Sequence, residues 1–178
     1  SNTPDYVQAR VEDSFNFDDD ELYLKEIKTD TLSDNIAELL ISKGYKSYSQ
    51  SDKNQMTTGF FDGQYGKTPL PHKIIAILAG VGWIGKNNLL ITPEYGCGIC
   101  IGVILTDAPL NVSRPQIIEA NCEGCETCLG FCNTNALKGC LWNKSVLREE
   151  MINVFECTTC MRCLVHCVYT QKYIERVK

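Results

Sequence analysis

The hydrophobic and polar positions along the chain predict helices that alternate with short strands. Residues 31–34 (Thr-Leu-Ser-Asp) have the form of a capping box, an apolar stripe follows them, and Gly44 supplies a C-terminal stop. We therefore expect a helix that begins near Thr31 and ends near Gly44. Residues 51–68 are rich in glycine and polar side chains, which predicts an irregular loop. The same patterning predicts helices over residues 71–79, 143–155 and 168–177 and strands over residues 45–49, 89–92 and 99–105.

The spacing of the cysteines is the pattern that indicates a chemical function. Eight of the eleven cysteines form two copies of one spacing, in which two intervals of three residues are followed by one of four. The first copy is Cys122, Cys125, Cys128 and Cys132, and the second is Cys157, Cys160, Cys163 and Cys167. This spacing is that of the thiolate runs that hold 4Fe–4S clusters in two-cluster bacterial ferredoxins.

The ferredoxin spacing also predicts which cysteines share a cluster. Three thiolates at steps of three residues can ligate three irons of one cubane, while the fourth thiolate reaches the neighbouring cluster. Zinc ribbons use two C-x-x-C pairs per metal, and disulfide scaffolds are typical of small secreted chains, so both alternatives explain the two runs less well. We predict that one cluster is held by Cys122, Cys125, Cys128 and Cys167, and the other by Cys157, Cys160, Cys163 and Cys132.

Composition and charge narrow the class of protein. The formal net charge is −5, and 44% of the residues are hydrophobic. Such an acidic chain has no general electrostatic attraction for nucleic acid, and no apolar stretch approaches the ~20 residues of a membrane span. No signal-peptide pattern is visible, and a chain rich in thiols suits a reducing compartment. We therefore expect a cytoplasmic protein with no membrane segment, from an organism that lives with little oxygen.

Together these patterns predict an α+β protein of two domains. Residues 1–112 carry most of the predicted helices and strands, and we expect them to form a mixed α/β domain. Residues 113–178 carry both cysteine runs, and we expect them to form a ferredoxin-like module with two 4Fe–4S clusters.

A glycine-rich segment matches a nucleotide-binding fingerprint in letters only. Residues 80–86 (GVGWIGK) contain G-x-G-x-x-G, and Asp107 follows at a suitable distance for a ribose contact. The fingerprint requires a strand before the glycines and a helix after them. Residues 87–93 (NNLLITP) are strand-like and end in proline, so no helix N-terminus is expected to face a pyrophosphate. The sequence therefore does not favour NAD binding.

Four segments before the cysteine runs carry a resemblance to a known family. In chain order they are residues 70–73 (LPHK), 79–86 (AGVGWIGK), 87–96 (NNLLITPEYG) and 105–110 (LTDAPL). With the double cysteine run, this order resembles the epoxyqueuosine reductases and their iron–sulfur relatives, which are themselves similar to corrinoid reductive dehalogenases. The resemblance covers residues 66–178, with weaker similarity at residues 3–6.

The resemblance implies cofactors and an activity. Members of that family bind cobalamin in the N-terminal domain and feed it electrons from two clusters. They reduce the epoxide of a queuosine precursor in tRNA or cleave carbon–halogen bonds. Residues 1–112 would then form part of a cobalamin-domain-like fold that is truncated at its N-terminus. The family's proposed proton donor, an aspartate, aligns with Gly66, and Asp62 is the nearest acid, which could substitute if the loop folds back.

The candidate cofactor-binding residues are His72, Trp83 and Lys86. His72 opens the predicted helix over residues 71–79, where it either meets a cofactor or caps backbone groups. Lys86 follows the glycine-rich turn, where it either meets a phosphate or propionamide group or is solvated. Trp83 is either a core residue or a platform for a cofactor. The sequence identifies no catalytic residue.

Three cysteines lie outside the runs. Cys97 and Cys100 form a C-x-x-C pair, and Cys140 lies between the runs. We interpret them as buried small hydrophobic residues, with a redox-active dithiol or ligands of an extra metal as the alternatives.

The sequence supports two functional hypotheses from different classes. In the first, the chain is an epoxyqueuosine reductase-like iron–sulfur oxidoreductase. It passes single electrons through two 4Fe–4S clusters to a cofactor, with cobalamin as a candidate, or to a substrate. In the second, it is a non-catalytic electron-transfer protein that serves a partner oxidoreductase. A redox partner such as a flavodoxin- or ferredoxin-like donor is expected, whereas tRNA is not an expected partner of this chain alone.

Overall fold

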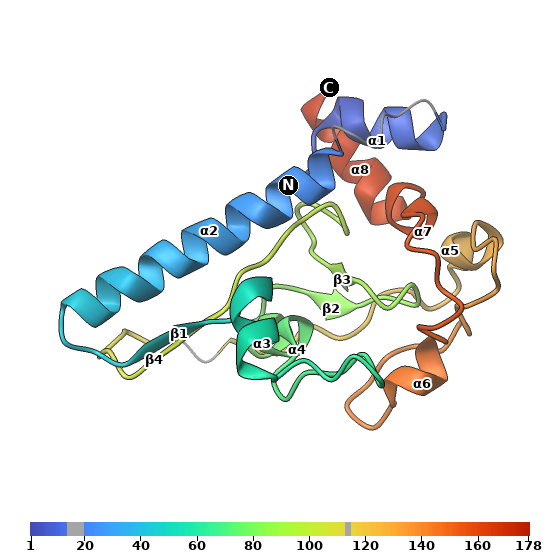
Figure 1. Ribbon diagram of the computed structural model, residues 1–178. Coiled ribbons are helices and arrows are strands. Elements are labelled where there is room, and N and C mark those ends of the chain that lie inside the picture. Colours follow the sequence, from blue (N-terminus) through green and yellow to red (C-terminus); the bar gives the residue numbers. More distant parts are fainter. Residues whose placement is uncertain (14–19, 113–114) are drawn as a thin grey trace. The chain divides into compact units, whose positions relative to one another are not determined.

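The computed structural model describes residues 1–13, 20–112 and 115–178 (Figure 1). By its internal contacts the chain divides into two units, and each unit is interrupted in sequence. The first, the cysteine unit, comprises Ser1–Asp18, Ala76–Ile99 and Pro115–Lys178. The second, the α2 unit, comprises Asp19–Ile75 and Cys100–Arg114.

The fold is mixed α/β, as the sequence predicts in coarse terms. The sequence predicts a mixed α/β domain over residues 1–112 and a two-cluster module over residues 113–178. This division stays a prediction. The contacts group the chain differently, because residues 76–99 and the N-terminal segment belong to the same unit as both cysteine runs.

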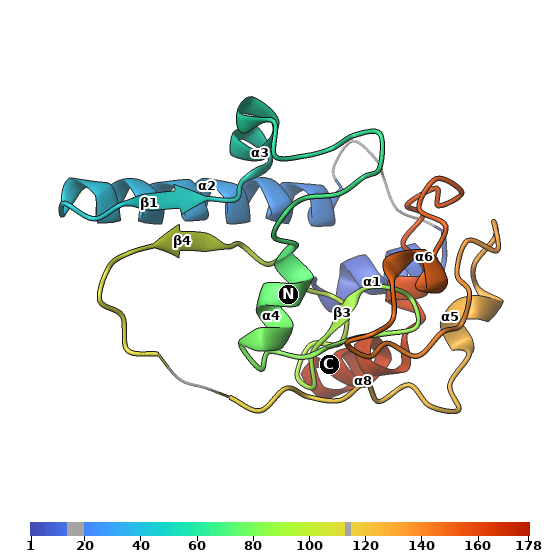
Figure 2. The ribbon, with the colours of Figure 1, turned by 90° about the horizontal axis from the view of Figure 1, so that it is seen from below.

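In the α2 unit, a long helix packs against a two-stranded antiparallel sheet (Figure 2). Helix α2 (Glu21–Ser42) contacts the strands β1 (Ser47–Ser49) and β4 (Ile104–Thr106), which pair with each other. Gly102 lies so close to the helix that a Cβ atom there would be 2.1 Å from Oγ of Ser33. A side chain at position 102 would therefore require the hydroxyl of Ser33 to move.

Helix α2 begins at Glu21 and not near Thr31, so the predicted start was wrong. The carboxylate of Asp20 caps the helix by accepting a hydrogen bond from the backbone N–H of Tyr23 (3.1 Å). Thr31 lies inside the helix, where its hydroxyl donates to a backbone carbonyl one turn earlier (2.8 Å). A hydroxyl that is satisfied within its own helix does not mark a cap. The predicted end is confirmed, because the helix stops just before Gly44, whose φ is 90°.

The segment predicted as an irregular loop, residues 51–68, contains a helix, α3 (Asp52–Thr58). The hydroxyl of Ser51 accepts a hydrogen bond from the backbone N–H of Asn54 (3.4 Å), and Gly59, with φ of 69°, ends the helix. A short helix of mostly polar residues has no apolar periodicity, so only its capping residues could have indicated it.

The cysteine unit is built from short elements. Its helices are α1 (Pro4–Val11), α5 (Thr127–Gly130), α6 (Arg148–Met151), α7 (Arg162–Val165) and α8 (Val168–Val177), and its strands are β2 (Trp83–Ile84) and β3 (Leu90–Ile91). Helix α1 contacts α7 and α8, and α5 contacts α7. Val7, Ile91, Met151 and Val165 are at most 1% exposed. The core of this unit therefore joins the N-terminal helix to the helices that carry both cysteine runs.

The glycine-rich segment forms part of a hairpin and not a phosphate-binding loop. Strands β2 and β3 pair antiparallel, with Trp83 opposite Ile91. Gly82 approaches β3 so closely that a Cβ atom there would be 2.0 Å from the carbonyl oxygen of Ile91. The strand β3 follows the glycines, as the sequence predicts. Gly82 is explained by backbone packing.

Between the two cysteine runs, the predicted helix over residues 143–155 is reduced to the single turn of α6. The backbone N–H of Asn153 donates to the carbonyl of Ala136 (2.9 Å), in an isolated antiparallel bridge. Backbone groups that pair across the chain in this way cannot continue a helix. This pairing joins segments far apart in sequence, so local patterning did not reveal it.

Several predicted elements are confirmed. Helix α8 has the predicted bounds, 168–177, and α4 (His72–Leu78) lies within the predicted residues 71–79. Strands β1 and β3 lie within their predicted segments. None of the helices in the described residues is both long and apolar enough to cross a membrane.

Candidate metal centre

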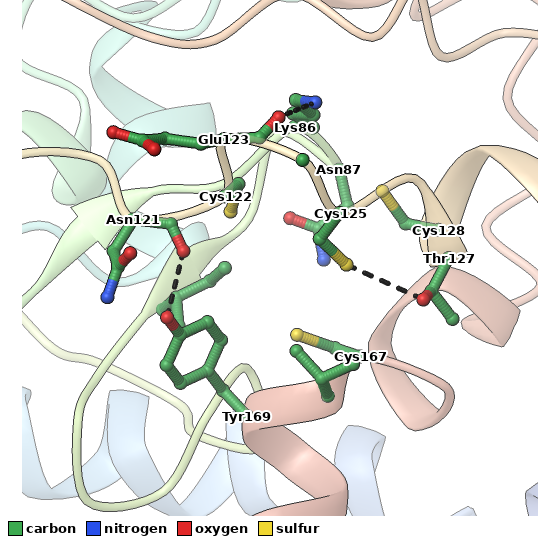
Figure 3. A pocket seen from close by; sticks show the side chains of 13 residues that line it. Lys86, Asn87, Asn121, Cys122, Glu123, Cys125, Thr127, Cys128, Cys167 and Tyr169 are labelled. Atoms are coloured by element: carbon green, nitrogen blue, oxygen red, sulfur yellow. Dashed lines mark hydrogen bonds between the residues drawn. The ribbon is translucent and has the colours of Figure 1, made fainter.

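Four thiols line one cavity of the cysteine unit (Figure 3). They belong to Cys122, Cys125, Cys128 and Cys167, and the cavity has a volume of about 240 Å³. Three of them come from the first cysteine run, and the fourth closes the second run at the N-terminal end of α8. Cys125 is half-buried, and the other three are buried. The structure thus brings together the four cysteines that the sequence assigns to one cluster.

The backbone of the first run turns its cysteines toward this cavity. The backbone N–H of Cys125 donates to the carbonyl of Cys122 (3.0 Å), which closes a turn. Cys128 lies on the single-turn helix α5, and the hydroxyl of Thr127 lies 3.5 Å from Sγ of Cys125. Cysteines that are three residues apart in the sequence therefore line the same cavity.

The remaining four cysteines of the runs, Cys132, Cys157, Cys160 and Cys163, are called the second thiol group here. Burial, and then the negative charges of Cys128, Cys160, Cys157 and Cys132, raise the pKa of the Cys163 thiol to about 12. Cys132, the last cysteine of the first run, thus acts on Cys163 together with Cys157 and Cys160, and so does Cys128 of the first group.

The thiols of the first group also disfavour one another's charge. Burial, and then Cys167, Cys122 and Cys125, raise the pKa of the Cys128 thiol to about 11. Thiolate ligands are deprotonated, so a metal centre that binds here must release protons. All eleven cysteines are free of disulfides. Among the residues described, no three His, Cys, Asp or Glu side chains have the geometry of a site for a single metal ion.

Two side chains hold the loop that carries the first thiols. Lys86 is 7% exposed, lines the cavity, and donates through Nζ to the carbonyl of Glu123 (2.7 Å). From the other side, the hydroxyl of Tyr169 on α8 donates to the carbonyl of Asn121 (2.8 Å). Lys86 is therefore neither solvated nor at a separate cofactor site in this structure. Through Glu123, it anchors the loop that follows Cys122.

Trp83 lies in the core of the cysteine unit. It is 3% exposed, and its ring meets the ring of Tyr169 edge to face, with centroids 4.9 Å apart. Its indole Nε1 has no hydrogen-bond partner within the described part of the chain. The structure therefore places Trp83 behind a residue that lines the thiol cavity.

His72 belongs to the α2 unit, whereas the other two candidates belong to the cysteine unit. Burial lowers the pKa of its imidazole, while Asp30, Asp52 and a hydrogen bond with the backbone of Gln50 raise it. The described surroundings of His72 are thus carboxylates and backbone of its own unit.

Sequence reasoning missed the part that Cys97 plays. Cys97 is 3% exposed, and its thiol accepts a hydrogen bond from Nδ2 of Asn87 (3.2 Å). The interaction between the two thiols of Cys97 and Cys167 raises the pKa of Cys97 and lowers the pKa of Cys167. Burial raises the pKa of Cys100, whose thiol lies 3.9 Å from the carbonyl of Leu22. Raised pKa values disfavour the hypothesis of an activated C-x-x-C dithiol.

Comparison with known proteins relates the chain to one group of enzymes. It is 40% identical to epoxyqueuosine reductase from Bacillus cereus over 68 residues, which are 38% of this chain and 17% of that relative. It is 44% identical to epoxyqueuosine reductase from Synechococcus over 71 residues, which are 40% of this chain and 22% of that relative. No protein-family model matches the chain. The chain thus spans about a fifth of the length of these curated relatives.

The fold resembles a solved structure over more of the chain. The structure of epoxyqueuosine reductase from Streptococcus thermophilus superimposes with a TM-score of 0.54 and 22% identity. The match covers 84% of this chain and 39% of that one. The chain is thus similar in sequence to epoxyqueuosine reductases over 68 to 71 residues, and its fold resembles that of one of them over most of its length.

Proposed function

We propose that the chain is part of an epoxyqueuosine reductase-like oxidoreductase that binds two 4Fe–4S clusters and transfers single electrons. The observation that carries the proposal is the thiol cavity. Three cysteines of the first run and Cys167 of the second share it, although Cys167 follows Cys128 by 39 positions in the printed sequence. A fold that brings the last cysteine of one run to the first three of the other suits two neighbouring cubanes.

The donor set fits such clusters. Thiolates are the soft ligands that iron–sulfur clusters take, and all eight run cysteines are free. One cluster would be held by Cys122, Cys125, Cys128 and Cys167. The other would be held by Cys157, Cys160, Cys163 and Cys132.

The chain's own residues would set the conditions for electron transfer. Clusters of this kind supply one-electron transfer when they are bound. Ile91 lines the thiol cavity and is 1% exposed, so it keeps water from that wall. Lys86 places a positive charge in the same cavity wall, where it would favour the more negative, reduced state.

Two of the candidate cofactor-binding residues are engaged within the fold. Trp83 and Lys86 are buried, and Lys86 is already bonded to the loop, so neither offers free surface to a ligand as large as cobalamin. We therefore propose no step through a corrinoid at these residues. Cobalamin stays a hypothesis for direct titration, as does a flavodoxin- or ferredoxin-like donor.

A specific observation favours the second candidate, a non-catalytic electron-transfer protein. Asp62 pairs with Lys67 in an antiparallel bridge, and Gly66 lies between them in the chain. However, the carboxylate of Asp62 accepts hydrogen bonds from the backbone N–H groups of Gln64 (3.0 Å) and Tyr65 (3.2 Å). The acid nearest to the position of the family's proposed proton donor is thus engaged in forming a turn.

Anaerobic purification with counts of iron, sulfide and cobalt tests the proposal. We expect about eight irons and eight sulfides per chain. Visible spectra with added cobalamin, before and after dithionite, then separate the two candidates. A stoichiometric corrinoid response favours the reductase, and cluster bands alone favour the electron carrier. A protein that holds zinc, or no metal after anaerobic reconstitution, would contradict both.

A further inference from the structure

Cys97 lies outside both cysteine runs, yet the backbone fixes it beside helix α8. Its N–H donates to Oγ1 of Thr170 (3.1 Å). The preceding Gly96, with φ of 59°, lies so close to α8 that a Cβ atom there would be 2.3 Å from the backbone nitrogen of Thr170. Because Cys167 immediately precedes α8, these contacts fix the position of Cys97 relative to Cys167.

The hydrogen bonds around the Cys97 thiol give it a direction. Nδ2 of Asn87 donates to Sγ of Cys97 (3.2 Å). The thiol of Cys167 is the side chain whose interaction most raises the pKa of Cys97. A thiol carries one proton and can also accept a hydrogen bond. Since Asn87 is the donor in the first bond, the single Cys97 proton is available for Sγ of Cys167.

The side chain of Asn87 is held by three hydrogen bonds. It is 3% exposed, and its Oδ1 accepts a hydrogen bond from the backbone N–H of Leu89 (3.1 Å). Its Nδ2 also donates to the backbone carbonyl of Cys163 (3.3 Å), which belongs to the second thiol group. The amide therefore uses its oxygen and both its protons, and it connects the two thiol groups.

We propose that Cys97, oriented by Asn87, donates its S–H to the ligand sulfur of Cys167 and thereby raises the reduction potential of the cluster that Cys167 helps to hold. The inference rests on the proposed function. A hydrogen bond to a ligand thiolate withdraws negative charge from it, which stabilises the reduced and more negative cluster. Cys97 is then neither a ligand nor a redox thiol, and its proton stays in place when the cluster accepts an electron.

Redox titration of the anaerobically loaded protein, followed by EPR, tests this role. We expect Cys97→Ala to keep about eight irons per chain and to lower one of the two potentials. At a fixed potential, the ratio of reduced to oxidised cluster should fall about tenfold, which is equivalent to about 59 mV for one electron. Cys97→Ser keeps a donor and should stay within about twofold of the wild type. Cys140→Ala, which removes another unassigned thiol of the same unit, should change neither potential.

A second substitution separates the loss of the hydrogen bond from a packing defect at position 97. Asn87→Leu leaves Cys97 in place but removes the group that orients it, so we expect a smaller shift of the same sign. Full iron content with unchanged potentials in both variants would overturn the tuning role and leave the proposed function standing. Loss of iron in every variant would also overturn it, because these residues would then be needed to hold clusters. Loss of iron in the wild type would instead refute the proposed function.

Discussion

The rings of Phe131 and His166 stack face to face, with centroids 3.5 Å apart and planes 5° apart. Each residue immediately precedes the last cysteine of its run, Cys132 or Cys167. The two runs are thus joined by an aromatic stack at equivalent positions. Helices α5 and α7, which end just before these two residues, are also in contact.

We expect Phe131→Ala to destabilise the cysteine unit by about 0.5–1.5 kcal/mol, because it removes the stack between the runs. The free energy of unfolding of the anaerobic protein, measured in urea, provides the test. Phe155→Ala is the matched control, since Phe155 is 71% exposed and should change stability by less than about 0.5 kcal/mol. Equal effects of the two substitutions would show that the stack contributes nothing.

Lys86→Met should lower the potential of the cluster in the thiol cavity, because it removes a buried positive charge and the bond to Glu123. The expected change is on the order of 1–3 kcal/mol in the free energy of reduction. Lys138→Met is the control, since Lys138 also donates to a backbone carbonyl (2.7 Å) but does so at the exposed surface. The account of Lys86 fails if EPR-monitored titration gives the same potentials for both variants.

Gly82→Ala should destabilise the hairpin by about 2 kcal/mol or more, because its Cβ atom would collide with the carbonyl of Ile91. Gly130→Ala meets no atom within 4 Å and lies in a helix, so it should be neutral or stabilising. Thermal unfolding of the two variants distinguishes them. A stable Gly82→Ala protein would mean that Gly82 serves a purpose other than backbone packing.

The stability of the α2 unit should depend on the protonation of His72. Burial lowers its pKa in the folded chain, so the unfolded chain binds the proton more tightly. Stability is therefore lost as pH falls through the unfolded value of about 6.5 toward the lower folded value. Urea unfolding at pH 7.5 and 5.5 should show a loss for the wild type that exceeds the loss for His72→Gln. The difference should be under about 1 kcal/mol, since His72 is partly exposed.

The carboxyl groups nearby act in the opposite sense and in another range of pH. Burial raises the pKa of Glu26 and of Asp30, so these groups lower stability as pH rises through their unfolded values near 4. Their unfolded values lie below the pH range over which wild type and His72→Gln are compared. Identical pH dependence of the two proteins would mean that His72 titrates normally in the folded chain.

Local patterns predicted much of the cysteine unit. The cysteine runs indicated which thiols lie together, and α8 has the bounds that its pattern predicts. The start of α2 was missed, because Thr31 satisfies its hydroxyl within the helix, a choice that the letters alone do not show.

Long-range contacts were beyond the reach of the sequence. Asn87 bonds to the backbone of Cys163, and Cys97 bonds to Thr170, across 76 and 73 positions of the chain. No periodicity encodes such pairs. The C-x-x-C spacing drew attention to Cys97 for another reason, as a dithiol partner of Cys100.

The central claim is that the two runs exchange their last cysteines, and paired substitutions test it most directly. If Cys125 and Cys167 hold the same cluster, the Cys125→Ser, Cys167→Ser double variant should lose one cluster and keep about four irons per chain. The Cys125→Ser, Cys132→Ser double variant should damage both clusters and keep few irons. The reverse result, with four irons retained only when Cys125 and Cys132 are replaced together, would contradict the crossed arrangement.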